Sequence, residues 1–504
     1  MTTENRFNLI DEPWIPIVDI GRVSLKELFI NHHYRALDGN PVQKIALTKL
    51  LLAIAQAAST PKDDEAWVNL GVNGLASNCL KYLDTWQERF WLYGEQPFLQ
   101  MPGISSASVQ SFGAVLAEIA TGNTTVLTQT QIEKRLSDVD KALLIVVLMG
   151  FGLGGKKTDN SVILSKGYSG KANDKGKPST GKPGASIGFM GYLHNFLVGQ
   201  SLLESLWLNV LTAEQIKEMR VYSNGLGTVP WELMPLGEDC DTAKSLQASL
   251  MGRLIPLSRF CLLTDTGLHY SEGIAHQGYK EGRVDPSVSV DYSGKDPKVI
   301  WVDPERRPWR FLTALLSFLG QSSSTGFNCH HLSFGLKRAR GQIKELGIWS
   351  GGLRVSSNAG EQYVSGSDDA VESLITLPQS VLGTFWFANL QLEMTDLEQL
   401  SKIVYSATLH YFKSQNMESK GQAGLASNLF WQLCERKFQD LVNVCDDADQ
   451  AQSLRKNFAG FANQAYDTFC AKDTARQLDA WAKNRPNLGK YLKDQNKHKE
   501  EAPA

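Results

Sequence analysis

Seven lysines lie among the glycines and prolines of residues 156–185, where their side chains could neutralise phosphate groups. They are Lys156, Lys157, Lys166, Lys171, Lys175, Lys177 and Lys182. Two aspartates oppose these seven lysines, so the segment carries a net charge of about +5. Because it holds too little apolar surface to offset the entropy of ordering it, we expect a loop. The residues leave open whether this is an ordinary solvated loop or one that orders on the phosphates of a nucleic acid.

A second candidate binding segment is residues 351–358, which lie between apolar stretches. Two glycines precede an arginine here, and small polar residues follow it. This pattern predicts a tight projecting turn, because glycine adopts backbone conformations that other residues disfavour. An ordinary hairpin is the alternative. The residues concerned are Gly351, Gly352, Arg354, Val355, Ser356, Ser357 and Asn358.

Motifs that would carry enzyme chemistry are absent from the sequence. It has no Walker A sequence, no Gly-x-Ser-x-Gly, no His-Glu-x-x-His and no His-Asp dipeptide. Its only Cys/His cluster, Cys329-His330-His331, lacks a second ligand pair at the usual spacing, so we expect packed core side chains there. The sequence therefore predicts neither a cofactor nor a metal, and no catalytic residue.

Composition limits the class of protein. The chain has 504 residues, of which 42% are hydrophobic and 21% are charged, as in a soluble globular protein with more than one core. A net charge of −2 argues against a free-standing nucleic-acid binder, but not against a subunit that contacts nucleic acid through local patches. Seven cysteines without a Cys-x-x-Cys pair suit reduced thiols in a cytoplasm. We expect no membrane association, because the longest apolar run, residues 142–151, is about half of the roughly 20 that a bilayer needs.

The patterning around these segments mixes strands with helices. Residues 7–17 predict a strand–turn–strand element, in which Phe7, Leu9 and Ile10 form the first strand. Apolar spacing predicts a helix over residues 41–58. Alternation predicts a hairpin whose strands, residues 287–292 and 298–303, turn at Ser293-Gly294.

From about residue 379 onward the apolar spacing becomes helical. Four segments place apolar side chains three or four residues apart and are joined by short polar connections, which predicts a four-helix bundle over residues 379–494. A polar tail, residues 495–504, follows it. We therefore predict an α+β protein in which a large mixed domain, residues 1–378, precedes the bundle.

Three N-terminal stretches resemble one known family in order and spacing. They read Phe-Asn-Leu-Ile-Asp-Glu-Pro-Trp-Ile-Pro-Ile over residues 7–17, Phe-Trp-Leu-Tyr over residues 90–93 and Gln-Pro-Phe-Leu-Gln over residues 96–100. The family is CasA, the large subunit of Cascade, the RNA-guided DNA-surveillance complex of type I-E CRISPR systems. The resemblance covers nearly the whole chain, and it is strongest at the N-terminus and in the bundle.

The resemblance implies a non-catalytic subunit of a crRNA-guided antiviral complex. Such a subunit recognises the protospacer-adjacent motif (PAM) on double-stranded target DNA and starts duplex opening and R-loop formation, while base pairing with the guide reads the sequence. The implied partners are the crRNA-containing Cascade complex, with its backbone, small and Cas5-type subunits, the double-stranded target DNA, and a helicase-nuclease effector that the subunit helps to recruit.

The resemblance also gives roles to individual residues. Lys280, or alternatively Arg283, stands where the family uses a lysine at the minor groove of the PAM. Gly122 and Asn123 match the start of a loop that locks onto the PAM region. Residues 351–358 would be a wedge beneath the PAM, although their tip departs from the Asn and Gln of the family's well-known member. A glycine-rich loop of the family faces the DNA in the region that here holds Lys171, Lys175, Lys177 and Lys182.

Two other classes of function stay open at this point. One is a divergent nuclease that uses scattered carboxylates and the Cys329-His330-His331 cluster. The other is a helical-bundle scaffold without nucleic-acid contact. Metal analysis and cleavage assays would identify the nuclease, and salt-dependent DNA binding would exclude the scaffold.

Overall fold

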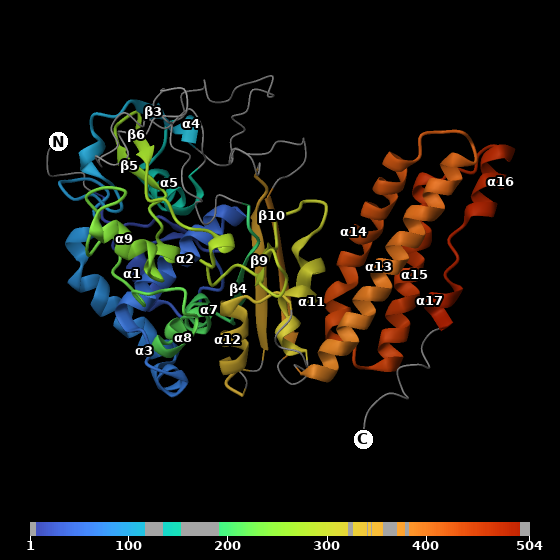
Figure 1. The fold of residues 1–504 in the computed structure, drawn as a ribbon, viewed down its shortest axis with the longest axis horizontal. Helices are drawn as coiled ribbons and strands as arrows, with labels where there is room; N and C mark the ends of the chain where they lie inside the picture. The colour runs from blue at the N-terminus through green and yellow to red at the C-terminus, as the bar shows by residue number, and fades with distance from the viewer. Residues whose placement is uncertain are drawn as a thin grey trace. The chain divides into compact units, whose positions relative to one another are not determined.

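The computed structural model describes residues 7–115, 135–152, 191–320, 326–339, 341–343, 345–355, 370–378 and 383–493 (Figure 1). Their elements mix helices with short strands, which confirms the mixed class expected from the sequence. Contacts between residues divide the chain into two compact units. Unit 1 comprises Met1–Pro308 and Ser324–Leu374, and unit 2 comprises Trp309–Ser323 and Ile375–Ala504. None of the described helices combines the length and the apolar composition needed to cross a bilayer.

The start of the described chain is a turn rather than a strand. The predicted strand through Phe7, Leu9 and Ile10 is wrong, because the Asn8 side chain accepts a hydrogen bond from the Ile10 amide at 2.9 Å and bends the backbone. Asn8 retains an isolated antiparallel bridge with Trp91. This bridge brings together two of the stretches that carry the family resemblance.

Helices make up most of unit 1. Helix α2, Pro41–Ser59, confirms the predicted helix and begins at Asn40, whose side chain caps it. Helices α3, Asp64–Thr85, and α5, Asp138–Phe151, both pack against α2. The other described helices of this unit are α1 (Leu25–Ile30), α4 (Phe112–Val115), α7 (Leu202–Asn209), α8 (Ala213–Glu218), α9 (Asp241–Gln247), α10 (Met251–Leu254) and α12 (His330–Ala339).

The described strands form four small sheets. One sheet has the order β10 (Ala370–Pro378), β9 (Glu345–Leu353) and β4 (His194–Val198). Helices α7 and α12 pack against β4. The other sheets consist of β3 (Val109–Ser111), β6 (Gly267–Glu272) and β5 (Arg259–Leu263); of β1 (Ile15–Ile17) and β2 (Gly21–Val23); and of β7 (Val290–Asp291) and β8 (Lys298–Val299).

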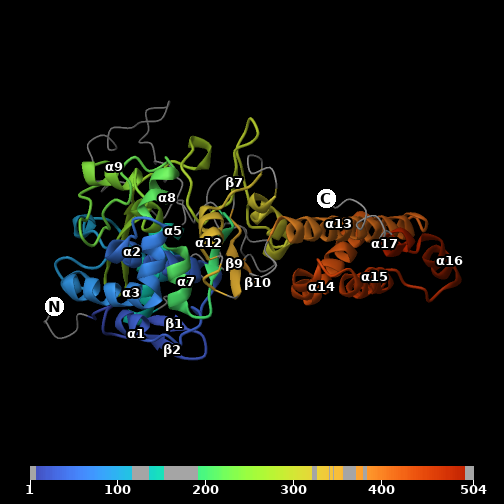
Figure 2. The same ribbon diagram turned by 90° about the horizontal axis from the view of Figure 1, so that it is seen from below.

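Strands β7 and β8 confirm the predicted hairpin. Val290 pairs with Val299 in antiparallel register. The connection, residues 292–297, is longer than the predicted Ser293-Gly294 turn, and the Asp291 carboxylate accepts hydrogen bonds from the amide and hydroxyl of Ser293 at 2.8 and 2.6 Å. Figure 2 shows this hairpin, near the label β7, at the edge of unit 1.

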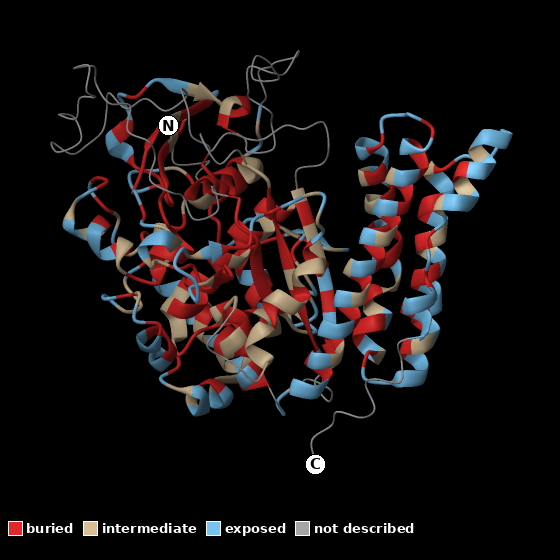
Figure 3. Ribbon diagram, turned by 45° about the vertical axis from the view of Figure 1, so that its right-hand side comes forward, coloured by how far each residue is buried: buried red, intermediate tan, exposed pale blue. Residues whose placement is uncertain are grey.

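Unit 2 consists mainly of helices. Helix α13, Thr384–Lys413, packs against α14, Lys420–Val444, α15, Ala448–Phe469, and α16, Ala475–Asn484. Each of the three long helices has one buried side and one exposed side (Figure 3). The shorter helical elements around them are η6 (Pro308–Phe311), α11 (Leu312–Leu315), η7 (Ser317–Leu319) and α17 (Gly489–Lys493).

Candidate nucleic-acid interface

Lys280 lies on η5, Tyr279–Glu281, a single helical turn in unit 1. The Glu281 carboxylate accepts a hydrogen bond from the Gly278 amide at 2.8 Å, which closes the start of the turn. Gly282 ends the turn with a φ of +75°, a left-handed conformation that favours glycine. The Lys280 side chain is exposed, and it forms no hydrogen bond or ion pair with any described residue. The turn therefore presents an available cation to solvent.

Arg283, the alternative cation, is engaged with the protein. Its side chain is half-buried, Nη1 donates to the Val221 carbonyl oxygen, and Nε donates to Gln277 Oε1 at 3.3 Å. A phosphate or base could bind this guanidinium only at the cost of those hydrogen bonds. The local geometry thus favours Lys280 as the residue that is free to contact a partner.

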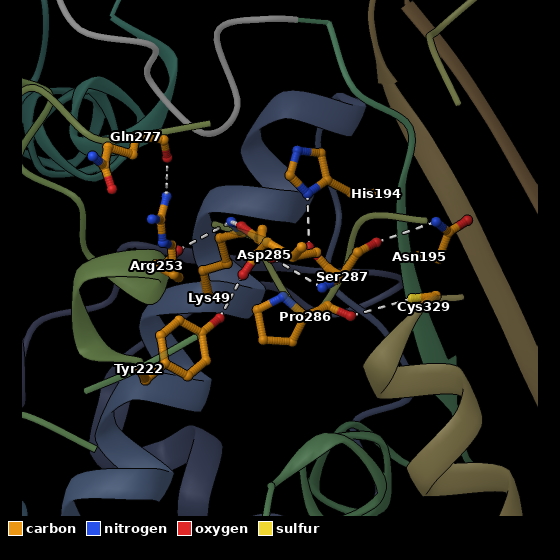
Figure 4. Close-up of polar contacts among 11 residues, drawn as sticks. Lys49, His194, Asn195, Tyr222, Arg253, Gln277, Asp285, Pro286, Ser287 and Cys329 are labelled. Atoms are coloured by element: carbon orange, nitrogen blue, oxygen red, sulfur yellow. Dashed lines mark hydrogen bonds and ion pairs between the residues drawn. The ribbon is translucent and has the colours of Figure 1, made fainter. Parts of the chain in front are cut away.

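A buried network around the ion pair between Lys49 of α2 and Asp285 anchors the chain on both sides of the Lys280 turn (Figure 4). Lys49 Nζ also donates to the Arg253 carbonyl oxygen at 3.2 Å, and Arg253 Nη1 donates to the Gln277 carbonyl oxygen at 3.0 Å. Gln277 precedes the turn and Asp285 follows it. The network therefore ties both ends of the turn to helices α2 and α10.

The surroundings keep Asp285 ionised. Burial alone would raise the pKa of its carboxyl, but the Lys49 ammonium, together with the Ser287 hydrogen bonds, holds that pKa below its usual range. The Ser287 hydroxyl donates to Asp285 Oδ1 at 2.6 Å and so accepts from Nδ1 of His194 at 2.8 Å. Burial lowers the pKa of His194 to about 3, so this imidazole is neutral. Loss of either ion-pair partner would leave an uncompensated buried charge, which makes the pair a fixed point of the fold.

Gly351 and Gly352 lie inside strand β9, and the prediction that they form a projecting turn is wrong. Both are buried, and the reason for glycine here is space. A Cβ at Gly351 would lie 2.6 Å from the Trp349 ring. A Cβ at Gly352 would lie 2.6 Å from Val302 Cγ2 and 2.8 Å from the Tyr192 carbonyl oxygen. Glycine within a strand commonly marks such a close approach of another segment.

Gly191 and Tyr192 lie next to residues of the other predicted DNA-contacting segments. Gly191 is the first described residue after the lysine-rich segment, and a Cβ there would lie 3.1 Å from Val355 Cγ2. Val355 is the first residue of the predicted wedge tip and the last residue described there. The Tyr192 ring meets the Tyr279 ring of the Lys280 turn edge-on, with centroids 5.9 Å apart. Segments that are distant in sequence therefore meet at residues 191–192, with Tyr279 against the Tyr192 ring and Val355 against Gly191.

The other predicted contact residues lie at the end of β9 or outside the described part of the chain. Arg354 and Val355 are half-buried just beyond the end of β9. The residues that lie outside the described part of the chain are Gly122, Asn123, Lys171, Lys175, Lys177, Lys182, Ser356, Ser357 and Asn358.

Sequence reasoning missed three residues of this region. Lys49 and Asp285 are 236 positions apart, and no local pattern marks either as half of a pair. One feature of the sequence could have pointed to Tyr192. It is an aromatic residue that closely follows a basic, glycine-rich segment.

The Cys329-His330-His331 cluster is packed within unit 1, as expected. Cys329 Sγ donates to the Pro286 carbonyl oxygen at 3.2 Å, and burial raises the pKa of this thiol to about 12. Burial lowers the pKa of His330 to about 4 and that of His331 to about 3. Within the described residues, no group of three or more His, Cys, Asp or Glu side chains is arranged to hold a metal ion.

Comparison with known proteins gives one consistent match. The family model of CRISPR-associated protein Cse1 matches residues 8–468. A curated relative, the CRISPR-associated protein CasA/Cse1 of Thermus thermophilus, is 27% identical over 344 residues, which are 63% of this chain and 61% of the relative. The aligned part thus spans less than two thirds of that relative's length.

Solved structures share the fold at low sequence identity. CasA of Thermus thermophilus superposes with a TM-score of 0.73 and 20% identity, covering 97% of this chain and 99% of that one. Cse1 of Thermobifida fusca superposes with a TM-score of 0.75 and 19% identity, covering 97% of this chain and 98% of that one. A chain of a CRISPR RNA-guided surveillance complex superposes with a TM-score of 0.69 and 16% identity, covering 95% of this chain and 99% of that one.

Proposed function

Since this chain belongs to the CRISPR-associated Cse1 family, we propose that it is the non-catalytic large subunit of a crRNA-guided surveillance complex. In this role it binds the PAM of double-stranded target DNA, starts duplex opening and R-loop formation, and helps to recruit the helicase-nuclease effector. The guide RNA reads the remaining sequence by base pairing.

The observation that carries the proposal is the convergence at residues 191–192. Tyr192 follows the lysine-rich segment in the chain, its ring contacts Tyr279 of the Lys280 turn, and its neighbour Gly191 lies against Val355 of the predicted wedge. These are the elements needed to hold phosphates, to contact a groove and to separate strands. A single lysine at the minor groove suits permissive recognition, because that groove presents a degenerate pattern of donors and acceptors.

Unit 2 has a different part in the proposal. We infer that helices α13 to α16 form the four-helix bundle expected over residues 379–494, and that it contacts the non-target strand and the small subunits. The support is their amphipathic character, since each long helix retains an exposed side (Figure 3). The backbone and Cas5-type subunits complete the complex around the crRNA.

Salt dependence tests the DNA contact directly. Replacing Lys171, Lys175 and Lys177 together with glutamine should weaken binding of PAM-containing duplex by the whole complex. The slope of log affinity against log salt concentration should fall by up to about 0.9 for each lost phosphate contact. Binding is measured by fluorescence anisotropy at several salt concentrations.

A triple arginine variant at the same positions is the matched control, because it keeps the charge and should keep the slope. An unchanged slope in the glutamine variant would make this segment an ordinary solvated loop.

A further inference from the structure

Four aromatic residues in and beside the β7–β8 hairpin are linked by contacts, and we name them the aromatic row. They are Tyr192, Tyr279, Tyr292 and Trp301. The Tyr192 ring lies between two of the others, with centroid distances of 5.9 Å to Tyr279 and 5.2 Å to Trp301. The Tyr292 hydroxyl donates to the Tyr279 carbonyl oxygen at 2.8 Å. These contacts connect all four residues.

The inner part of the aromatic row is buried in a small apolar cluster. Tyr192 is 7% exposed and packs with four valines of the hairpin region, and Tyr279 is partly buried against the same cluster. The valines are Val284, Val288, Val290 and Val299. Core packing alone therefore accounts for Tyr192 and Tyr279.

Packing does not account for the outer members of the row. Tyr292 is 45% exposed and Trp301 is 38% exposed. Among the described residues of unit 1, these two are the exposed large aromatic side chains. A chain that only needed to close this hairpin could end it with polar residues.

Contacts within this chain restrain both outer residues before any ligand binds. The hydroxyl hydrogen bond restrains Tyr292. Trp301 forms an antiparallel bridge with Tyr192, and the neighbouring backbone is fixed by hydrogen bonds from Leu193 to Ile300 at 3.0 Å and from Val302 to Gly191 at 2.8 Å. A ring that is fixed before binding loses little entropy when a flat ligand stacks on it.

The surroundings fit a nucleic acid better than an apolar peptide. Lys280 follows Tyr279 directly, and the hairpin adds the exposed Lys295 and Lys298, which lie near the carboxylates of Asp291 and Asp296. Aromatic rings next to cations are the arrangement with which proteins hold single strands, because bases stack on the rings while lysines meet the phosphates.

We propose that Trp301 and Tyr292 form a stacking site for unpaired bases of the DNA strand released next to the PAM. The proposal rests on the function proposed above and adds a ligand class to it: single-stranded DNA, held through its bases rather than only through its phosphates. Captured bases would no longer be free to pair again, so the site would favour the opened duplex.

A pair of oligomers isolates the contribution of the bases. The full chain is titrated with fluorescent twelve-residue oligothymidine and with an abasic oligomer of equal length and charge. Wild-type protein should bind oligothymidine about tenfold more tightly, because stacking on one ring contributes about 1.4 kcal/mol, or a factor of ten. Trp301→Ala should abolish most of this ratio, whereas Trp301→Phe should keep most of it.

Two further measurements guard against a folding defect. Leu236→Ala, which removes an exposed apolar side chain elsewhere in unit 1, should leave the ratio unchanged. Photo-cross-linking of wild-type protein to 5-iodouracil DNA should label Trp301 or Tyr292, as mapped by mass spectrometry. Equal affinity for both oligomers, or cross-links confined to other residues, would overturn the proposal.

The test separates this site from the proposed function. If the assembled complex discriminates PAM from non-PAM duplex while the full chain binds both oligomers equally, the stacking site is refuted and the PAM role stands. If the chain favours oligothymidine but the complex shows no PAM discrimination, the PAM role fails. The claim that the site binds the strand released next to the PAM then fails with it.

Discussion

Replacing residues 355–358 with a Gly-Ser linker of equal length should spare assembly of the complex but slow R-loop formation on relaxed linear duplex by roughly tenfold or more. A side chain driven between base pairs must offset an unstacking cost of about a few kcal/mol per step, and about 1.4 kcal/mol is a factor of ten. It can do so only from a rigid base. Val355 supplies one, because it lies two residues beyond β9 and against Gly191. The rate is measured by gel shift on a PAM-containing duplex.

Negative supercoiling or a pre-melted bubble beside the PAM should restore much of the lost rate, since the work of opening is then already done. Leu236→Ala, which changes an exposed side chain elsewhere in unit 1, is the control and should leave the rate unchanged. Normal opening of relaxed duplex by the first variant would reduce residues 355–358 to an ordinary surface segment.

Lys280→Ala should weaken binding of PAM-containing duplex by the complex about ten- to hundredfold and change binding of duplex without a PAM only slightly. A hydrogen bond from a charged donor contributes about 1.5–3 kcal/mol, which corresponds to that range. Lys280 is exposed, free of described partners and set on a turn that is anchored at both ends. Affinities on the two duplexes are measured side by side at one salt concentration.

Lys217→Ala is the matched control, because this exposed lysine of α8 lies outside the Lys280 turn and the hairpin. It should affect both duplexes slightly and equally. Equal losses on both duplexes for Lys280→Ala would mean that Lys280 contacts only phosphate. The PAM contact would then have to come from Arg283 after release of its protein hydrogen bonds.

Elements with a strong local pattern could be predicted from the sequence. The helix at Pro41–Ser59 and the hairpin around Val290 and Val299 formed where periodicity indicated. The apolar spacing beyond residue 379 became long helices, because burial of one helix side depends mainly on residues three and four apart. The turn at Asn8 was missed because a single side-chain hydrogen bond competes with strand pairing there.

The site depended on contacts that local patterns do not encode. Gly351 and Gly352 suggested a turn, yet Gly351 leaves room for the Trp349 ring, and Gly352 lets Tyr192 and Val302 approach the strand. The neighbours that require glycine at position 352, Val302 and Tyr192, are 50 and 160 positions away in the sequence. The Lys49–Asp285 pair joins α2 to the Lys280 turn over an even longer separation. Exposed cations such as Lys280 could be nominated from the sequence, but the anchors that hold them could not.

Permanganate footprinting of thymines beside the PAM tests the central claim most directly. Relaxed target duplex is treated after incubation with the assembled complex, either with or without this chain, and with either the PAM or a scrambled motif. Reactive thymines are expected only when both the chain and the PAM are present. Equal reactivity in the complex that lacks the chain, or on the scrambled duplex, would contradict the claim that this protein recognises the PAM and starts duplex opening.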